Sequence, residues 1–198
     1  MEIPMINETL LALIPMCAPD VAPNTIAQII RVESRGDPLA INVNGLGKKV
    51  RAESQAEAAR LTRYYINAGY SVDVGLMQVN SSNFAGLGYS HDRIEALFEP
   101  CANIAAGSQI LKNFYLRHKG NKGEATALRA AISAYNTGSP TRGVANGYVG
   151  QVYGVKSQKR QNAMMENPQL SQAYRAPTAV DVSSISGSKR GQSPSKPE

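Results

Sequence analysis

The residue of this sequence with the clearest chemical potential is a glutamate on the apolar face of a predicted helix. Ile26, Ile29 and Ile30 are spaced as one helix face, and the next position on that face is Glu33. A glycine and a proline within residues 36–38 predict that the helix stops just after Glu33. Burial among apolar neighbours and the negative end of the helix dipole both disfavour a carboxylate. The pattern therefore predicts a raised pKa for Glu33, which suits a general acid working near neutral pH.

An ordinary role for Glu33 is the alternative. Arg31 and Arg35 are close enough in sequence to form an ion pair with it, and ion pairs also perturb carboxyl groups that have no catalytic role. Ser34, which follows directly, could orient Glu33 or bind a sugar. Its hydroxyl could equally bond to the backbone of its own helix end.

Two further polar clusters interrupt apolar patterns. Gly75, Met77 and Gln78 belong to the segment GLMQ, which follows an extended stretch and precedes Asn80, while the segment AYN at residues 134–136 closes a predicted helix. Taken singly, these residues have simple explanations: Gln78 and Asn80 as turn residues, and the tyrosine of AYN as a core aromatic with a satisfied hydroxyl.

Together, and in this order, the three clusters are much more specific. Glu-Ser at a helix end, then Gly-Leu-Met-Gln, then Ala-Tyr-Asn resembles the soluble lytic transglycosylases, a peptidoglycan-cleaving family with the lysozyme fold. The resemblance covers about residues 17–153. It is most similar to the VirB1 type, associated with type IV secretion and conjugation, through the segments CAPDVAP, VESRGDPLAINVNG, QVN and EPCANI and a helix-bearing insertion at residues 42–70.

The resemblance implies a reaction and a set of site residues. Glu33 would protonate the glycosidic oxygen between N-acetylmuramic acid and N-acetylglucosamine and then act as a base toward the C6 hydroxyl of the muramyl residue, giving a 1,6-anhydro product. No cofactor and no metal are implied, the partners are peptidoglycan strands and type IV secretion or conjugation components, and the location is the periplasm. The implied substrate-binding residues are Ser34, Gly75, Met77, Gln78, Asn80, Tyr135, Asn136 and Tyr148, the last by a weaker match.

Three other functions compete with this one. A hydrolytic muramidase would need a second carboxylate, and Asp73, Asp37 and Glu99 are the candidates. A wall-binding assembly subunit would keep the sugar cleft without turnover. Nucleic-acid binding is suggested by the net charge alone, and no DNA-binding motif accompanies that charge.

Composition narrows the class without choosing a partner. The chain has 198 residues, a net charge of +6 and a pI near 9.4, which suits an anionic partner such as nucleic acid, a membrane surface or an acidic wall polymer. Cys17 and Cys101 have no metal-type spacing with each other or with the two histidines, so they form either a long-range disulfide or two buried thiols. No apolar run is long enough for a transmembrane helix, and the first residues lack the basic start of a signal peptide.

These residues must be positioned by a mainly helical domain of the α+β, lysozyme-like class, with a small strand element beside the cleft. We expect the domain to span residues 1–166 and residues 167–198 to form a disordered basic tail. The first predicted helix is capped by Asn7, and a loop is expected at residues 42–50. The capping box of Ser54 and Glu57 opens a helix that we expect to bury Ala58, Leu61, Tyr65 and Ala68. A strand is predicted near residues 70–74, and further helices near 94–98, 104–120, 128–135 and from 148.

Overall fold

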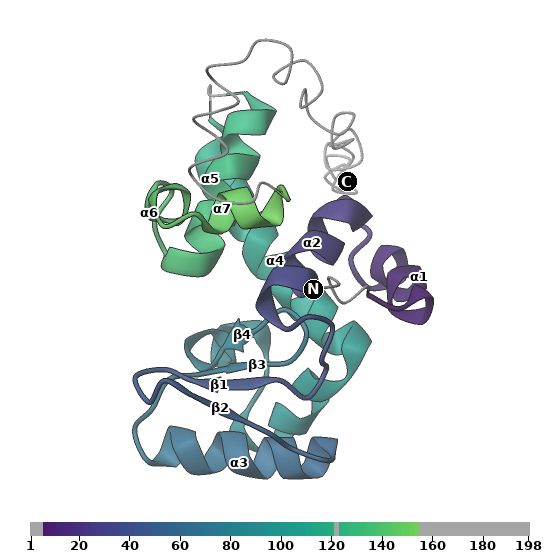
Figure 1. Ribbon diagram of the computed structural model, residues 1–198, viewed down its shortest axis with the longest axis vertical. Helices are drawn as coiled ribbons and strands as arrows, with labels where there is room; N and C mark the ends of the chain where they lie inside the picture. Colours follow the sequence, from purple (N-terminus) through teal and green to yellow (C-terminus); the bar gives the residue numbers. More distant parts are fainter. Residues whose placement is uncertain (1–5, 121–122, 155–198) are drawn as a thin grey trace, which may run out of the picture.

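The computed structural model describes residues 6–120 and 123–154, which form helices around a small antiparallel sheet (Figure 1). This confirms the expected fold class, while the tail at 167–198 and the predicted end of the domain at residue 166 lie outside the described residues. In order, the elements are α1 (Glu8–Cys17), α2 (Pro23–Glu33), β1 (Ile41–Val43), β2 (Lys48–Val50), α3 (Gln55–Asn67), β3 (Val72–Val74), β4 (Val79–Asn80), the 3-10 helices η1 (Ser81–Asn83), η2 (Ala85–Leu87) and η3 (His91–Phe98), α4 (Pro100–Lys119), α5 (Glu124–Thr137), α6 (Arg142–Ala145) and α7 (Tyr148–Val152).

The start of the first helix and the end of the second lie where the sequence predicted them. The side chain of Asn7 accepts a hydrogen bond from the backbone N–H of Leu10 at 2.8 Å and so caps α1. Pro23 starts α2 in the first turn, where its missing N–H costs nothing, and Glu33 is the last residue of the helix. The chain leaves α2 through Arg35 and Gly36, both with left-handed backbone angles.

The predicted loop at residues 42–50 is wrong, because this segment forms a β-hairpin. β1 and β2 pair antiparallel with Ile41 opposite Val50, and Gly45 and Gly47 make the turn with positive φ. The strands are only three residues long, and the alternation of Ile41 and Val43 with asparagine was too short to stand out from its glycine-rich surroundings. The glycines mark the turn of the hairpin rather than an irregular loop.

The sheet has the order β2-β1-β3-β4 and puts three polar residues in one row. The predicted strand near 70–74 is β3, in which Val72 and Val74 are buried on one face. Successive side chains alternate between faces, so Asp73 points to the opposite one. Asn42 on β1 and Asn80 on β4 are the direct cross-strand neighbours of Asp73.

The buried apolar residues form two clusters, one among the helices and one around the sheet, and α4 contributes to both. Figure 1 shows the sheet and α3 at one end of the molecule, the helices α1, α2, α5, α6 and α7 at the other, and α4 extending between them. Ile104 and Leu111 of α4 belong to the helical cluster, whereas Ala106 belongs to the cluster under the sheet. The helix predicted at 104–120, which is α4, therefore connects the helical cluster to the cluster around the sheet.

The remaining helices differ from the predictions in detail. On α3, Ala58 is buried as predicted, and Leu61 and Tyr65 are partly buried against the cluster around the sheet. Ala59 and Thr62 are also buried, whereas Ala68 is exposed beyond the helix end. The helix predicted near 94–98 is the 3-10 helix η3, and α6 was not predicted. None of the helices in the described residues combines the length and apolarity that a membrane crossing requires.

Candidate active site

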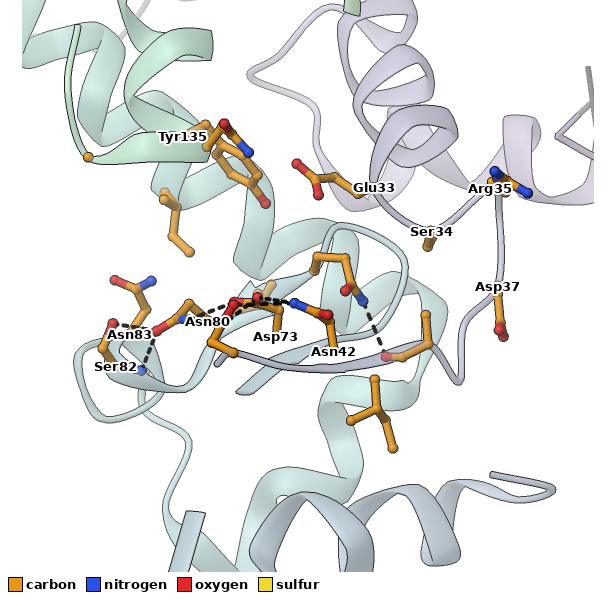
Figure 2. A pocket seen from close by; sticks show the side chains of 18 of the residues that line it. Glu33, Ser34, Arg35, Asp37, Asn42, Asp73, Asn80, Ser82, Asn83 and Tyr135 are labelled. Atoms are coloured by element: carbon orange, nitrogen blue, oxygen red, sulfur yellow. Dashed lines mark hydrogen bonds between the residues drawn. The ribbon is translucent and has the colours of Figure 1, made fainter. Parts of the chain in front are cut away.

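A cleft of about 800 Å³ lies between the end of α2, the sheet and the end of α5 (Figure 2). The sheet contributes its polar face, and α4 forms part of the wall. The lining residues are Glu33, Ser34, Arg35, Asp37, Ala40, Ile41, Asn42, Asn44, Val50, Arg51, Asp73, Gln78, Val79, Asn80, Ser82, Asn83, Ile110, Phe114, Ala134, Tyr135, Asn136 and Gly138.

Glu33 enters this cleft from the last turn of α2, as the sequence pattern predicted. Burial raises the pKa of its carboxyl group from 4.5 to about 7, opposed by a hydrogen bond from Tyr148 and assisted by the negative charge of Asp73. The ion-pair alternative is wrong, because Arg31 donates instead to Gln28 Oε1 at 2.8 Å and to a main-chain carbonyl of α7 at 2.7 Å. Neither arginine forms a salt bridge within the described residues.

Tyr148 at the start of α7 donates its hydroxyl hydrogen to Oε1 of Glu33. Its backbone N–H is in turn held by Asn146 Oδ1 at 3.0 Å. Burial, followed by the charge of Glu33, raises the pKa of the Tyr148 hydroxyl above its usual range, so it stays a neutral donor. With Oε1 occupied as an acceptor, the acidic proton of Glu33 belongs on Oε2.

Asp73 is held by the side-chain amides of three asparagines. Its Oδ1 accepts from Asn80 at 2.6 Å, and its Oδ2 accepts from Asn42 at 3.1 Å and Asn44 at 2.9 Å. Asn80 is itself fixed, since its Oδ1 accepts from the backbone N–H of Ser82 at 3.0 Å. We name Asn42, Asn44 and Asn80 the asparagine cage. Asn80 is therefore at the cleft as predicted, but its side-chain hydrogen bonds are already shared among Asp73, Ser71 and Ser82.

Within the GLMQ segment, Gly75 and Met77 lie beneath the surface of the cleft. Met77 is fully buried, and its carbonyl accepts the hydroxyl hydrogen of Tyr135 at 2.8 Å. A Cβ on Gly75 would lie 2.2 Å from the side-chain nitrogen of Asn103, so only glycine fits there. Neither Gly75 nor Met77 lines the cleft, which corrects their assignment as direct substrate contacts. Both shape the backbone beneath it.

Gln78 does line the cleft, with a left-handed backbone at φ 50°. Its side-chain nitrogen donates to the carbonyls of Ala40 at 3.2 Å and Gly75 at 3.0 Å, joining the loop to the start of β1. Asn103 on α4 holds the same loop, because its Oδ1 accepts the Met77 N–H at 2.8 Å. Asn103 was missed from the sequence. Its signal, an asparagine on the apolar side of a long helix, lay within the segment EPCANI.

The other predicted residues lie at the two helix ends. The Ser34 hydroxyl donates to the Ile30 carbonyl at 3.2 Å and accepts from the Gly36 N–H at 3.1 Å, which is the local role left open by the sequence. Asn136 is exposed at the end of α5, where its Oδ1 accepts from Asn146 at 3.0 Å. Both line the cleft, and both keep polar atoms available to a ligand.

Of the three candidate second carboxylates, two reach the cleft. Asp73 and Asp37 line it, whereas Glu99 lies at the N-cap position of α4 and does not. No group of three or more His, Cys, Asp or Glu side chains within the described part of the chain could hold a metal ion. The polar side chains that line the cleft carry carboxyl, amide, hydroxyl and guanidinium groups.

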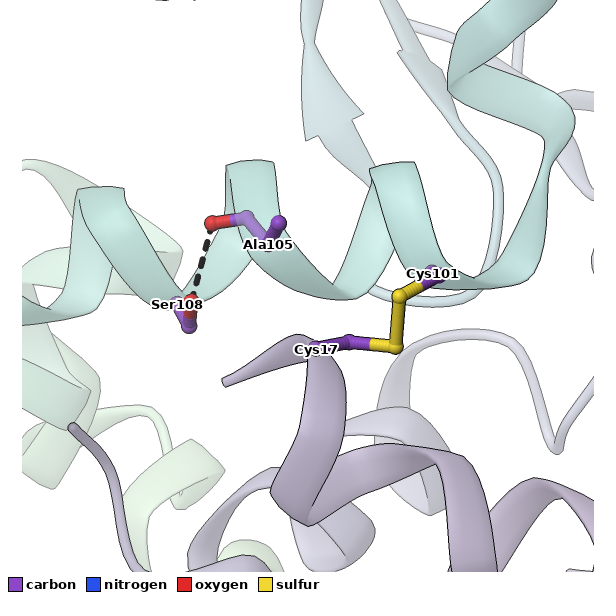
Figure 3. Close-up of a disulfide and its surroundings, with 4 residues drawn as sticks. All are labelled: Cys17, Cys101, Ala105 and Ser108. Atoms are coloured by element: carbon purple, nitrogen blue, oxygen red, sulfur yellow. Dashed lines mark hydrogen bonds between the residues drawn. A yellow bond between two sulfur atoms is a disulfide. The ribbon is translucent and has the colours of Figure 1, made fainter. Parts of the chain in front are cut away.

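A disulfide joins Cys17 to Cys101, 84 residues apart, with 5.1 Å between the Cα atoms (Figure 3). It ties the end of α1 to the first turn of α4. Because α1 also packs against α2, the disulfide helps to fix α2, the helix that carries Glu33, relative to α4.

Comparison with known proteins agrees with this geometry. The family model for the transglycosylase SLT domain matches residues 11–157. The chain is 44% identical over 136 residues to protein virB1 of Agrobacterium fabrum, 42% over 153 residues to protein virB1 of Rhizobium radiobacter, and 40% over 136 residues to the type IV secretion system protein virB1 of Brucella abortus. These matches cover 69%, 77% and 67% of this chain and 54%, 62% and 56% of the three relatives, so the chain spans little more than half of their lengths. No solved structure is significantly similar.

The match extends over the helix of Glu33, the sheet, the GLMQ segment and the AYN segment, which are the parts that build the cleft. The chain belongs to the transglycosylase SLT domain family.

Proposed function

We propose that this chain is a peptidoglycan lytic transglycosylase, which cleaves the β-1,4 bond between N-acetylmuramic acid and N-acetylglucosamine with formation of 1,6-anhydro-N-acetylmuramic acid. The single observation that carries the proposal is Glu33, a carboxyl group with a pKa near 7 in a cleft whose lining also offers amide and hydroxyl side chains. Such a group holds its proton at neutral pH and can also accept one, as a general acid that becomes a general base must do.

The reaction can be written with Glu33 in both roles. Its proton passes to the glycosidic oxygen as the bond to C1 of the muramyl residue breaks, and the substrate's N-acetyl group helps to stabilise the positive charge at C1. Glu33, now a carboxylate, takes the proton of the C6 hydroxyl as that oxygen bonds to C1. The proton lost in the first step is regained in the second, and no water is consumed.

Tyr148 supports both protonation states. Its hydroxyl hydrogen bond stabilises the carboxylate formed after the first step, so it limits the rise in pKa that burial alone would cause. The asparagine cage orients Asp73 in the same cleft as Glu33, where its negative charge favours the protonated form of Glu33 and a developing positive charge on the sugar.

A hydrolytic muramidase is the second candidate, because Asp73 lines the same cleft. That reaction requires Asp73 to attack C1 or to activate water. Its two oxygens already accept three amide N–H groups, which stabilise the anion and lower its readiness to form a new bond. The internal C6 hydroxyl needs no such nucleophile, and we therefore favour the transglycosylase.

The relatives and the disulfide support a cellular role in type IV secretion. One relative is named a type IV secretion system protein. The cleavage of glycan strands would open the wall locally for a secretion or conjugation apparatus. Such an enzyme works in the periplasm, an oxidising compartment in which the Cys17–Cys101 bond persists.

Mass spectrometry of a digest of purified peptidoglycan sacculi tests the proposal. We expect released muropeptides that end in anhydro-muramic acid, each lighter by one water than a hydrolysis product, and we expect Glu33→Gln to fold and release none. Glu95→Gln, which removes an exposed carboxyl outside the cleft, is the matched control and should release them normally. Hydrated products from the unaltered protein would identify a muramidase, and no products would identify a non-catalytic assembly subunit.

A further inference from the structure

The two ends of the cleft differ in chemistry. In Figure 2, Asn80, Ser82 and Asn83 lie on one side of Glu33, and Arg35 and Asp37 lie on the other. The first group offers neutral donors and acceptors that suit hydroxyl and N-acetyl groups. The second offers charge, which a neutral sugar does not need.

Arg35 occupies a backbone conformation that arginine rarely adopts. Within the described residues, only Arg35 at φ 60° and Gln78 at φ 50° are non-glycine residues with positive φ, and both line the cleft. For Gln78 the strained backbone is compensated by two side-chain hydrogen bonds to main-chain carbonyls. The Arg35 guanidinium is exposed and bonds to none of the described residues. Strain of this kind is concentrated at functional positions.

Arg51 comes to the same end of the cleft from the hairpin. Val50, the last residue of β2, pairs with Ile41, the first residue of β1, so the next residue along lies opposite Ala40 and beside the segment from Asp37. Arg51 is exposed, lines the cleft, and has no side-chain hydrogen bond or ion pair in the described part of the chain. By contrast, Arg63 and Arg142 each donate to a main-chain carbonyl.

We propose that Arg35 and Arg51 bind free carboxylates of the peptide attached to muramic acid, so that the cleft selects peptide-bearing glycan strands. The inference rests on the proposed function, since it assigns part of the same substrate to the same cleft. In peptide-bearing strands the lactyl carboxyl group is consumed in the amide bond to the peptide, and the free carboxylates belong to the peptide. A guanidinium binds a carboxylate through two parallel hydrogen bonds, which is the recognition that paired arginines supply.

At this end of the cleft the two guanidinium groups outnumber the single carboxylate of Asp37. One of its oxygens, Oδ1, accepts the Leu39 N–H at 2.9 Å and so serves the turn after α2. The other remains for an N–H or ammonium group of the peptide. The arrangement therefore fits a peptide that carries both carboxylates and N–H donors better than it fits a simple polyanion.

The test measures binding, in a Glu33→Gln background so that no substrate is consumed. Three probes are compared: peptide-bearing glycan strands, the same strands with their carboxyl groups converted to amides, and strands stripped of peptide by an amidase, which exposes the lactyl carboxylate. We expect amide conversion to raise the Kd by about three- to tenfold, the range for a pair of exposed guanidinium–carboxylate contacts. When Arg35→Gln and Arg51→Gln are added together, binding to the unconverted strands should weaken by the same factor as amide conversion causes. Amide conversion should then have no further effect on the Kd.

The matched control removes the same charge elsewhere. Arg93 and Arg129 are exposed and lie outside the cleft, so Arg93→Gln with Arg129→Gln should keep the full discrimination. Equal loss in the control pair would assign the effect to bulk charge and overturn the proposal. So would equal affinity for native and amide-converted strands. Tightest binding to stripped strands, lost with the two arginines, would move the contact to the lactyl carboxylate and refute the peptide assignment.

Failure of this inference and failure of the proposed function have different signatures. The binding measurement needs no turnover, so it stands even if the unaltered protein releases no anhydro products. Conversely, normal release of anhydro products together with no discrimination between the probes would refute the arginine subsite and leave the lytic reaction in place.

Discussion

The raised pKa of Glu33 predicts a specific dependence of stability on pH. In the unfolded chain this carboxyl group loses its proton near pH 4.5, whereas in the folded protein it keeps the proton until about pH 7. Between these values the folded state binds more protons than the unfolded state, so stability falls as pH rises. The contribution is complete below pH 4.5 and lost above pH 7. The shift from 4.5 to about 7 corresponds to about 3 kcal/mol in the free energy of unfolding.

Glu33→Gln removes this proton equilibrium and keeps the shape of the side chain. Its amide oxygen can still accept the Tyr148 hydroxyl hydrogen, so the variant should match the unaltered protein within about 1 kcal/mol at pH 4. At pH 8 the variant should be the more stable by about 3 kcal/mol. Other titrating groups are common to both proteins and cancel in the difference.

Urea unfolding followed by circular dichroism from pH 4 to pH 8, without reductant, measures this difference directly. Glu95→Gln serves as the control because it removes an exposed carboxyl, and its curve should run parallel to that of the unaltered protein. If the Glu33→Gln curve also runs parallel, Glu33 is not desolvated in the folded state, and the reasoning that makes it a general acid fails. The experiment requires no substrate.

Two more predictions concern contacts around Glu33 and its helix. Tyr148→Phe removes a hydrogen bond that lowers the pKa of Glu33, so the alkaline limb of the pH–activity profile should move up by about one pH unit. The control, Tyr115→Phe, removes a buried hydroxyl with no partner in the described residues and should leave the limb in place. Equal behaviour of the two variants would contradict the role of Tyr148. Replacing Cys17 and Cys101 by alanine opens a loop of 84 residues and should lower the free energy of unfolding by about 4 kcal/mol. Urea unfolding measures this loss. An unchanged urea midpoint would show that the disulfide does not stabilise the folded state.

Features set by local sequence patterns could be predicted, whereas features set by contacts between distant segments could not. The position of Glu33 followed from helical periodicity and a helix stop, both of which are local and survive in any tertiary context. The hairpin at 42–50 did not, since its three-residue strands derive their stability from pairing with each other and, for β1, with β3, rather than from their own residues. Asn103 was missed for the same reason. Its importance lies in a hydrogen bond to Met77, 26 residues earlier, and a polar residue on the apolar side of a helix does not by itself identify such a partner.

The asparagine cage shows why tertiary pairing matters for the chemistry. Register alone sets Asn42 and Asn80 on either side of Asp73, so their amides reach its oxygens without any local motif. Neutral amides satisfy the hydrogen-bonding needs of Asp73 while leaving its charge in place. A lysine or arginine in the same row would cancel that charge and with it one of the causes of the raised pKa of Glu33. The choice of amides over cations on the sheet is therefore part of what keeps Glu33 protonated near neutral pH.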